Sequence, residues 1–196
     1  MKYLKKISFL ILTSIFLFIL YLEFGGNYIL DNKAKRTILL NMRVNKKLPQ
    51  NVTRFYNTIY KNSLSKNSWN FFLSSDYQKD CPCYQMSHKI LPTLEIKNVS
   101  PIDYFHVTRY IERNFTQTEC LSYNLNNFDF LEKRKGIDTV SKSLFNKSIE
   151  NLEPLELAEV FAIYEQPLKN NRNRNPEKAS KSIKRHYNIY LKNLIN

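Results

Sequence analysis

The stretch that decides the fold spans residues 103–126 and reads DYFHVTRYIERNFTQTECLSYNLN. Its first half carries apolar side chains at the spacing of one helix face, at Tyr104, Val107 and Ile111. Thr116 is followed three residues later by Glu119, a capping-box pattern that starts a helix. The stretch therefore predicts two consecutive helices joined by a short turn.

Similar signals recur on both sides of this stretch. We predict further helices over residues 52–60, after Gly136, over residues 154–164, and from Pro176 onward, where Asn175 is suited to the cap. The chain has only 3 glycines and 7 prolines, too few for the many tight turns of a small β-sandwich. The predicted fold class is mainly α.

The basic charge of the chain is unevenly distributed. The 196 residues carry a formal net charge of +13, yet residues 32–75 contain no Asp or Glu and nine Lys or Arg. This window cannot supply a catalytic carboxylate. Basic residues interleaved with aromatic residues are also typical of proteins that bind single-stranded nucleic acid. The membrane segment described next argues against a nucleic-acid partner.

The N-terminus has the pattern of a membrane anchor. Three lysines precede 16 largely apolar residues, Ile7 to Leu22, which rise about 24 Å as a helix. The nearest pair of small residues, Gly25-Gly26, follows Glu23 and Phe24, so we expect an uncleaved anchor rather than a signal peptide. We divide the chain into a cytoplasmic tip (1–6), a transmembrane anchor (7–24), a basic juxtamembrane segment (25–47) and a helical domain (48–196) on the outer side of the membrane. The juxtamembrane segment either lies on anionic headgroups, at about 1 kcal/mol per basic residue, or is a solvated polar face.

The sequence offers little local metal or nucleophile chemistry. Cys81-Pro82-Cys83 lacks the two-residue spacer of zinc and redox motifs, and the three histidines are far apart, so we assign no metal site. With Cys120 as a third thiol, one disulfide is an alternative, but ordinary thiols are our expectation.

Several segments share an order and spacing with one known family. Residues 111–126 resemble L-E-x-x-[YF]-[ST]-K-x-E-I-L-x-x-Y-L-N, and residues 136–152 resemble G-I-x-x-A-x-x-Y-F-G-K-x-x-x-x-L. Residues 152–167 follow L-x-x-x-E-x-A-x-x-A-x-x-x-x-x-P, and residues 175–179 match N-P-x-x-A. Upstream, residues 81–91 can be laid over S-T-I-x-Q-Q-x-x-K-x-L. The chain thus resembles a peptidoglycan glycosyltransferase, the lipid II-polymerising domain of class A penicillin-binding proteins and monofunctional transglycosylases.

The resemblance implies a lysozyme-like, two-lobed helical domain behind a single N-terminal transmembrane helix. It also implies that the membrane is the bacterial inner (plasma) membrane and that the domain lies on its periplasmic side. Such domains join lipid-linked disaccharide units, with a first Glu as general base and a second Glu near the pyrophosphate, often with a divalent metal. The implied substrate-binding residues are Gln85, Lys89, Asn126 and Lys147. The residues implied to fix helices and caps are Glu112, Glu156 and Pro167.

The sequence departs from this family at both catalytic positions. Tyr104 stands where the second Glu belongs, and Pro101 stands where a Lys is usual. The first motif, E-D-x-x-F-x-x-H, belongs at about residues 40 to 60, inside the acid-free window. We therefore assign no catalytic residue and keep Asp103 and Glu112 as fallback carboxylates.

The expected function is a glycosyltransferase-like protein of cell-wall assembly that lacks the catalytic glutamates and binds lipid II or glycan, or acts as a scaffold. Its expected partners are lipid II or a glycan strand, membrane lipids and cell-wall synthesis proteins. We expect no cofactor; a divalent metal such as magnesium would be needed only if the protein is active. One alternative is a divergent active polymerase, with a carboxylate recruited from Asp76, Asp80, Asp103 or Glu112 to a cleft lined by Gln85 and Lys89. Another is an unrelated helical membrane protein.

Overall fold

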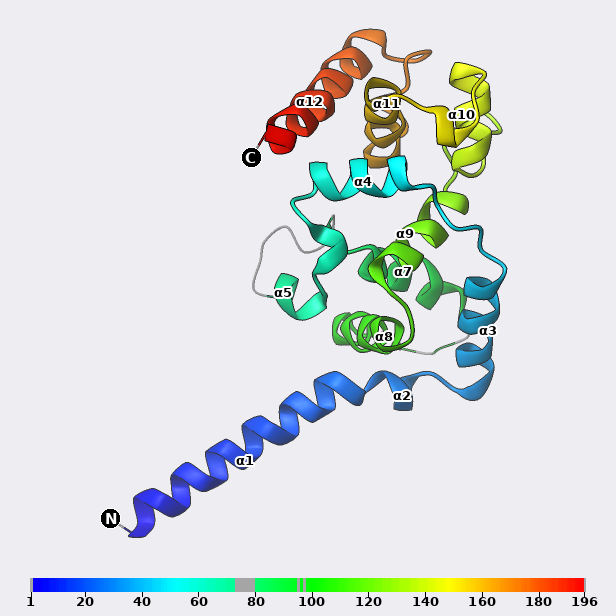
Figure 1. Ribbon diagram of the computed structural model, residues 1–196. Helices are drawn as coiled ribbons and strands as arrows, with labels where there is room; N and C mark the ends of the chain where they lie inside the picture. Colours follow the sequence, from blue (N-terminus) through cyan, green and yellow to red (C-terminus); the bar gives the residue numbers. More distant parts are fainter. Residues whose placement is uncertain (1, 73–79, 95, 97, 196) are drawn as a thin grey trace.

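The protein is helical, as predicted (Figure 1). The computed structural model describes residues 2–72, 80–94, 96 and 98–195; among these no strand forms beyond a single bridge between Asp129 and Lys135. The longer helices are α1 (Lys2–Phe24), α3 (Asn32–Arg43), α4 (Gln50–Ile59), α7 (Pro82–Ile90), α8 (Pro101–Asn114), α9 (Gln117–Asn126), α10 (Ile137–Phe145), α11 (Pro154–Glu165) and α12 (Pro176–Ile195). Shorter elements are α2 (Gly26–Ile29), α5 (Ser68–Phe72) and the 3-10 turns η1 (Ser63–Ser65), η2 (Leu91–Thr93) and η3 (Ile149–Asn151).

The helix starts follow the capping signals in the sequence. Glu119 Oε2 accepts a hydrogen bond from the Thr116 amide at 2.8 Å, and Thr116 Oγ1 accepts one from the Glu119 amide at 3.2 Å. At α8, the Asp103 carboxylate accepts from the Ser100 amide at 2.7 Å. Each pair satisfies backbone groups that a helix end leaves open.

The helices enclose two hydrophobic cores. One core joins α4, α10, α11 and α12 and contains the large buried residues Phe55, Tyr56, Phe130 and Phe161. The other joins α2, α3, α7 and α8 and contains Leu30, Ile38, Met86 and Ile111. Helix α9 serves both, since Leu121 and Leu125 belong to the first core and Cys120 to the second. The two-lobed helical domain is therefore built around α9.

The expectation of free thiols is wrong for two of the three cysteines. Cys83 on α7 and Cys120 on α9 form a disulfide, and their Cα atoms lie 4.9 Å apart. The packing of α7 against α9 brings the two residues within the short range that a disulfide requires. Cys81 remains a buried free thiol.

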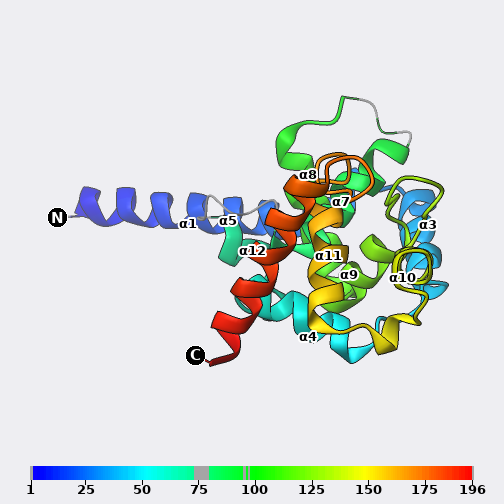
Figure 2. The same ribbon diagram turned by 90° about the horizontal axis from the view of Figure 1, so that it is seen from above.

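The first helix extends away from the domain, as both views show (Figures 1 and 2). Residues Lys5–Phe24 form a helix long and apolar enough to cross a membrane. After it, α2 and α3 bury Leu30, Ala34, Ile38 and Met42 in the second core. Packing is thus continuous across the boundary at residue 48 that we placed between juxtamembrane segment and domain.

Candidate functional site

A cavity of ≈ 210 Å³ is lined by residues of α7 and α11 and of the turns that follow α4, α9 and α11. We call it the Lys89 pocket; its described lining is Tyr60, Gln85, Lys89, Phe128, Tyr164, Glu165 and Gln166. The volume lies below the usual range of sites that hold a complete ligand. It suits a subsite for one sugar ring or one phosphate group.

Lys89 is a partly desolvated cation in this pocket. Its Nζ lies 5.3 Å from the Phe128 ring centroid and 5.6 Å from that of Tyr164, and it donates to the Asn124 carbonyl at 3.2 Å. Burial lowers the pKa of Lys89 to about 8. No carboxylate forms an ion pair with it among the described residues, so an anionic ligand would supply the missing countercharge.

Gln85 lies one helical turn before Lys89, on the same face of α7. Its Oε1 accepts a hydrogen bond from the Tyr164 hydroxyl at 2.7 Å, which fixes the amide against α11. The structure therefore brings together the two predicted substrate-binding residues of the upstream motif.

Glu165 is the one carboxylate among the described residues that line the pocket. Its Oε1 accepts from the Tyr60 hydroxyl at 2.8 Å and lies 3.1 Å from His186 Nε2, while its Oε2 accepts from Arg185 Nη2 at 2.6 Å. Burial by itself raises the pKa of Glu165, but the hydrogen bond and charge of His186, with Tyr60 and Arg185, outweigh it and hold the pKa at about 2. Glu165 is thus a stable anion already engaged by three partners.

Tyr60 reaches the pocket from the end of α4. Burial, followed by the neighbouring Glu165 charge, raises the pKa of its hydroxyl well above the usual value. The hydroxyl therefore stays protonated as a donor to Glu165.

Sequence reasoning missed both Tyr60 and Glu165 as pocket residues. The available signals were their positions in the sequence. Tyr60 lies at the end of the range, residues 40 to 60, in which the family's first Glu belongs, and Glu165 lies two residues before Pro167, which matches the family.

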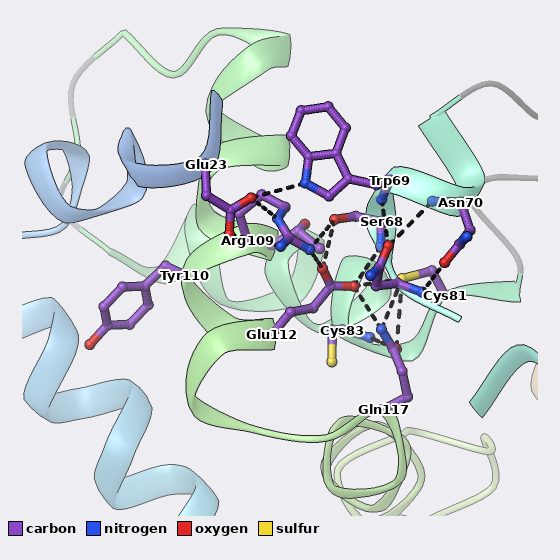
Figure 3. A network of polar contacts seen from close by, with 12 residues as sticks. Glu23, Ser68, Trp69, Asn70, Cys81, Cys83, Arg109, Tyr110, Glu112 and Gln117 are labelled. Atoms are coloured by element: carbon purple, nitrogen blue, oxygen red, sulfur yellow. Dashed lines mark hydrogen bonds and ion pairs between the residues drawn. The ribbon is translucent and has the colours of Figure 1, made fainter. Parts of the chain in front are cut away.

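The two fallback carboxylates have other partners. Asp103 caps α8 through the Ser100 amide. Glu112 lies in a buried network (Figure 3), where it pairs with Arg109 and accepts from Ser68 Oγ at 2.6 Å and Gln117 Nε2 at 2.7 Å. Neither lines the Lys89 pocket. Asp80 is also not among its described lining residues, and Asp76 lies outside the residues that the structure describes.

Tyr104, at the family's second Glu position, is half-buried on α8. Its ring stacks on that of His88, with centroids 4.0 Å apart, and packs against the second core. Tyr104 thus contacts the ring of His88 at the position where the family has its second catalytic Glu.

The remaining predicted residues lie apart from the pocket. Asn126 Nδ2 donates to the Lys46 carbonyl at 2.6 Å, which holds the segment after α3 against α9. Lys147 pairs with Glu156 at 2.8 Å, and Glu156 also accepts from the Glu153 amide to cap α11. Pro167 lies two residues after Glu165, the last residue of α11. Substrate contact by Asn126 and Lys147 stays a prediction.

The family's divalent metal finds no suitable ligands here. Magnesium is bound through carboxylates and water, and Glu165, the pocket's described carboxylate, already accepts hydrogen bonds on both oxygens. No group of three metal-ligating side chains gathers elsewhere in the described part of the chain. The described residues of the Lys89 pocket therefore offer no carboxylate that is free of other partners to such a metal.

Comparison with known families gives the class of protein. The transglycosylase family model matches residues 93–193, slightly more than half of the chain, so the protein belongs to the transglycosylase family. Membership supports a peptidoglycan glycosyltransferase-like role with a glycan or lipid II substrate. No curated protein matches the chain. The match begins after α7, so the assignment of Gln85 and Lys89 depends on the upstream motif and the pocket geometry.

Proposed function

We propose that this chain is a membrane-anchored transglycosylase-family protein that binds lipid II or a glycan strand during cell-wall assembly without polymerising it. The observation that carries the proposal is the engagement of Glu165, the pocket's described carboxylate, by Tyr60, Arg185 and His186.

Polymerisation requires a base that takes the proton of an attacking sugar hydroxyl. An effective base has a pKa near the working pH. Glu165, with a pKa of about 2, has little affinity for that proton. Loss of a general base typically costs about 10²–10⁴-fold in rate, and Tyr104 at the second Glu position adds to the deficit.

Binding is better supported than catalysis. Lys89 offers a cation for a phosphate group of the lipid-linked substrate, in surroundings where electrostatic attraction is strong. Tyr60, Phe128 and Tyr164 provide aromatic surfaces, and Gln85 and Gln166 provide amides for sugar hydroxyls. The pocket combines apolar walls with a few convergent polar groups, as ligand sites do.

The contacts of α1 support a retained anchor. Glu23 pairs with Arg109 at 2.8 Å and accepts from Trp69 Nε1 at 2.9 Å, and the Tyr21 ring packs edge-on against buried His106. Cleavage after residue 24 would leave Arg109 without Glu23. The disulfide favours a domain on the oxidising, outer side of the plasma membrane. Intact-mass measurement of protein purified from membranes should find residues 1–24 present; a mature N-terminus near Gly25 would contradict the anchor.

The binding proposal is tested with full-length protein in nanodiscs and fluorescent lipid II. Lys89→Met should weaken binding at least about tenfold, roughly the loss of one charge-assisted contact. Lys142→Met, which removes an exposed lysine on α10, should bind like the native protein. Equal affinities for Lys89→Met and native protein would contradict the proposal.

One observation favours the second candidate, a divergent active polymerase. The pKa of Lys89, about 8, leaves part of the population as a neutral amine near physiological pH, and such lysines serve as general bases. Glycan chains formed by native protein and lost in Lys89→Met would select this alternative.

A further inference from the structure

The end of the membrane anchor is part of a polar network that continues into the domain (Figure 3). The Glu23 carboxylate accepts hydrogen bonds from Arg109 Nη2 at 2.8 Å and from Arg109 Nε at 2.9 Å, so a bidentate pair ties α1 to α8. On its other side the Arg109 guanidinium pairs with Glu112, one turn further along α8. The side chains of Arg109 and Glu112 are 10% and 5% exposed, so each buried charge depends on its partner.

Gln117 continues this network from α8 to α7. Its Nε2 donates to Glu112 Oε1 at 2.7 Å, and its Oε1 accepts from the Cys83 amide at 3.0 Å. The Cys83 amide lies in the first turn of α7, where amides have no partner within the helix. The buried Gln117 side chain thus bridges a carboxylate of α8 and the start of α7. We call Arg109, Glu112 and Gln117 the relay.

The helix at the end of the relay carries two residues of the Lys89 pocket, Gln85 and Lys89. Tyr164 on α11 contacts both: its hydroxyl donates to Gln85 at 2.7 Å, and its ring centroid lies 5.6 Å from Lys89 Nζ. The Cys83–Cys120 disulfide joins α7 to α9, so the two helices are held as one unit. A shift of this unit relative to α11 would change both contacts of the pocket.

We propose that Glu23 of the membrane anchor is a positioning residue for the Lys89 pocket. It acts through the relay, which fixes the start of α7 and with it Gln85 and Lys89. The anchor therefore contributes to ligand affinity by more than holding the protein at the membrane. This inference rests on the proposed binding function, because it concerns the ligand of the same pocket.

Docking of the anchor by itself accounts for only part of the network. Among the described contacts, neither Glu112 nor Gln117 forms a hydrogen bond with α1; they connect α8 to α5, α7 and α9. The hydroxyls of Ser87 and Thr108, 2.9 Å apart, join α7 to α8 further along. Loss of the relay should therefore shift the start of α7 without releasing the helix, and the effect on affinity should be moderate.

The test compares full-length native protein with Glu23→Gln, which keeps the shape of the side chain and removes its charge. The ligand is a water-soluble, short-chain analogue of lipid II, so that recruitment to a membrane does not enter the measured affinity. Affinity should fall about threefold to tenfold in the variant, and hydrogen exchange in a peptide that covers α7 should become faster. Asp138→Asn, which removes the partner of Lys46 outside the relay, should change neither quantity.

A double-mutant cycle tests whether the anchor and the relay act in series. Gln117→Met keeps a similar volume and removes both hydrogen bonds of the side chain. If Glu23 acts through Gln117, adding Glu23→Gln to Gln117→Met should cause little further loss of affinity. Independent effects would multiply.

Two results would overturn the proposal. One is that Glu23→Gln speeds exchange only in α2 and α5 and leaves α7 and the affinity unchanged, as expected of a residue that merely docks the anchor. The other is that the two fold-losses multiply in the double variant. If native protein does not bind the analogue at all, the proposed function fails. Exchange in α7 then decides whether Glu23 positions this helix: faster exchange in Glu23→Gln supports it, and unchanged exchange contradicts it.

Discussion

The Tyr60 hydroxyl donates a 2.8 Å hydrogen bond to Glu165 Oε1, which joins the end of α4 to the end of α11 inside the Lys89 pocket. The tyrosine comes from the edge of the acid-free window, and the glutamate from the family-matched half of the chain. The pocket thus contains a carboxylate held as a hydrogen-bond acceptor, and we propose that it does not act as a base. This pair is the structural basis of our account of a binding protein.

Glu165→Gln should destabilise the protein by about 2–4 kcal/mol, because Arg185 and His186 lose a half-buried anionic partner. The folded pKa of about 2 lies below the ordinary 4.5, so the carboxylate's contribution is complete above the higher value and is lost as pH falls through the lower one. Urea unfolding in detergent from pH 7 to pH 2.5 should show a steeper loss of stability for native protein than for the variant. Glu150→Gln, at an exposed site, serves as control; identical pH profiles for native protein and Glu165→Gln would contradict the prediction.

Lys89→Met should raise stability at pH 7 by about 1–3 kcal/mol while it weakens ligand binding, because a desolvated cation is removed. The folded pKa of about 8 lies below the ordinary 10.5, so protonation favours the unfolded chain. The loss of folding stability that the charged lysine causes is complete below pH 8 and disappears as pH rises through 10.5. Thermal melts should show native protein gaining stability relative to the variant between pH 7 and 10. A variant less stable than native protein at pH 7 would mean that the lysine is structural.

Arg109→Met should cost about 3–5 kcal/mol, because both Glu23 and Glu112 lose their cation in the buried network of Figure 3. The loss should appear as faster hydrogen exchange across α2, which packs on α8 next to this network. Arg113→Met removes a cation over the Phe24 ring and a charge that acts on Glu23 without an ion pair, so it should change exchange less than Arg109→Met does. Unchanged exchange in Arg109→Met would show that the anchor docks without this ion pair.

Removal of the disulfide by a Cys83→Ser, Cys120→Ser double substitution should destabilise the domain by about 2–4 kcal/mol, as expected for a loop closed by residues 37 apart. Since α7 carries Gln85 and Lys89, lipid II binding should weaken as well. Cys81→Ala should leave binding intact, since this thiol has no disulfide partner. Denaturant-induced unfolding of the native protein with and without reductant measures this contribution. A free energy of unfolding that does not change with reductant would contradict the prediction.

The helices could be predicted from local signals that the structure retains. Thr116 with Glu119, and Pro154 with the start of α11, mark helix ends through backbone groups that must be satisfied nearby. These interactions span three or four residues, so a single sequence contains them in full.

The site could be predicted only in part, because it depends on distant contacts. The motif spacing predicts Gln85 and Lys89 as binding residues, but Tyr60 meets Glu165 across 105 residues of chain. The Cys83–Cys120 bond likewise depends on how α7 and α9 pack, which spacing along the chain does not reveal. Glu112 matched the family motif yet lies in the network that docks the anchor.

The central claim is tested most directly by glycan-chain formation from labelled lipid II by the full-length protein in detergent, resolved by gel electrophoresis. The same preparation must first bind lipid II, so that a lack of product reports on chemistry rather than on misfolding. Our account predicts that the bound substrate remains monomeric at the end of the reaction. Accumulation of polymer that is lost in Lys89→Met would contradict it and establish an active glycosyltransferase.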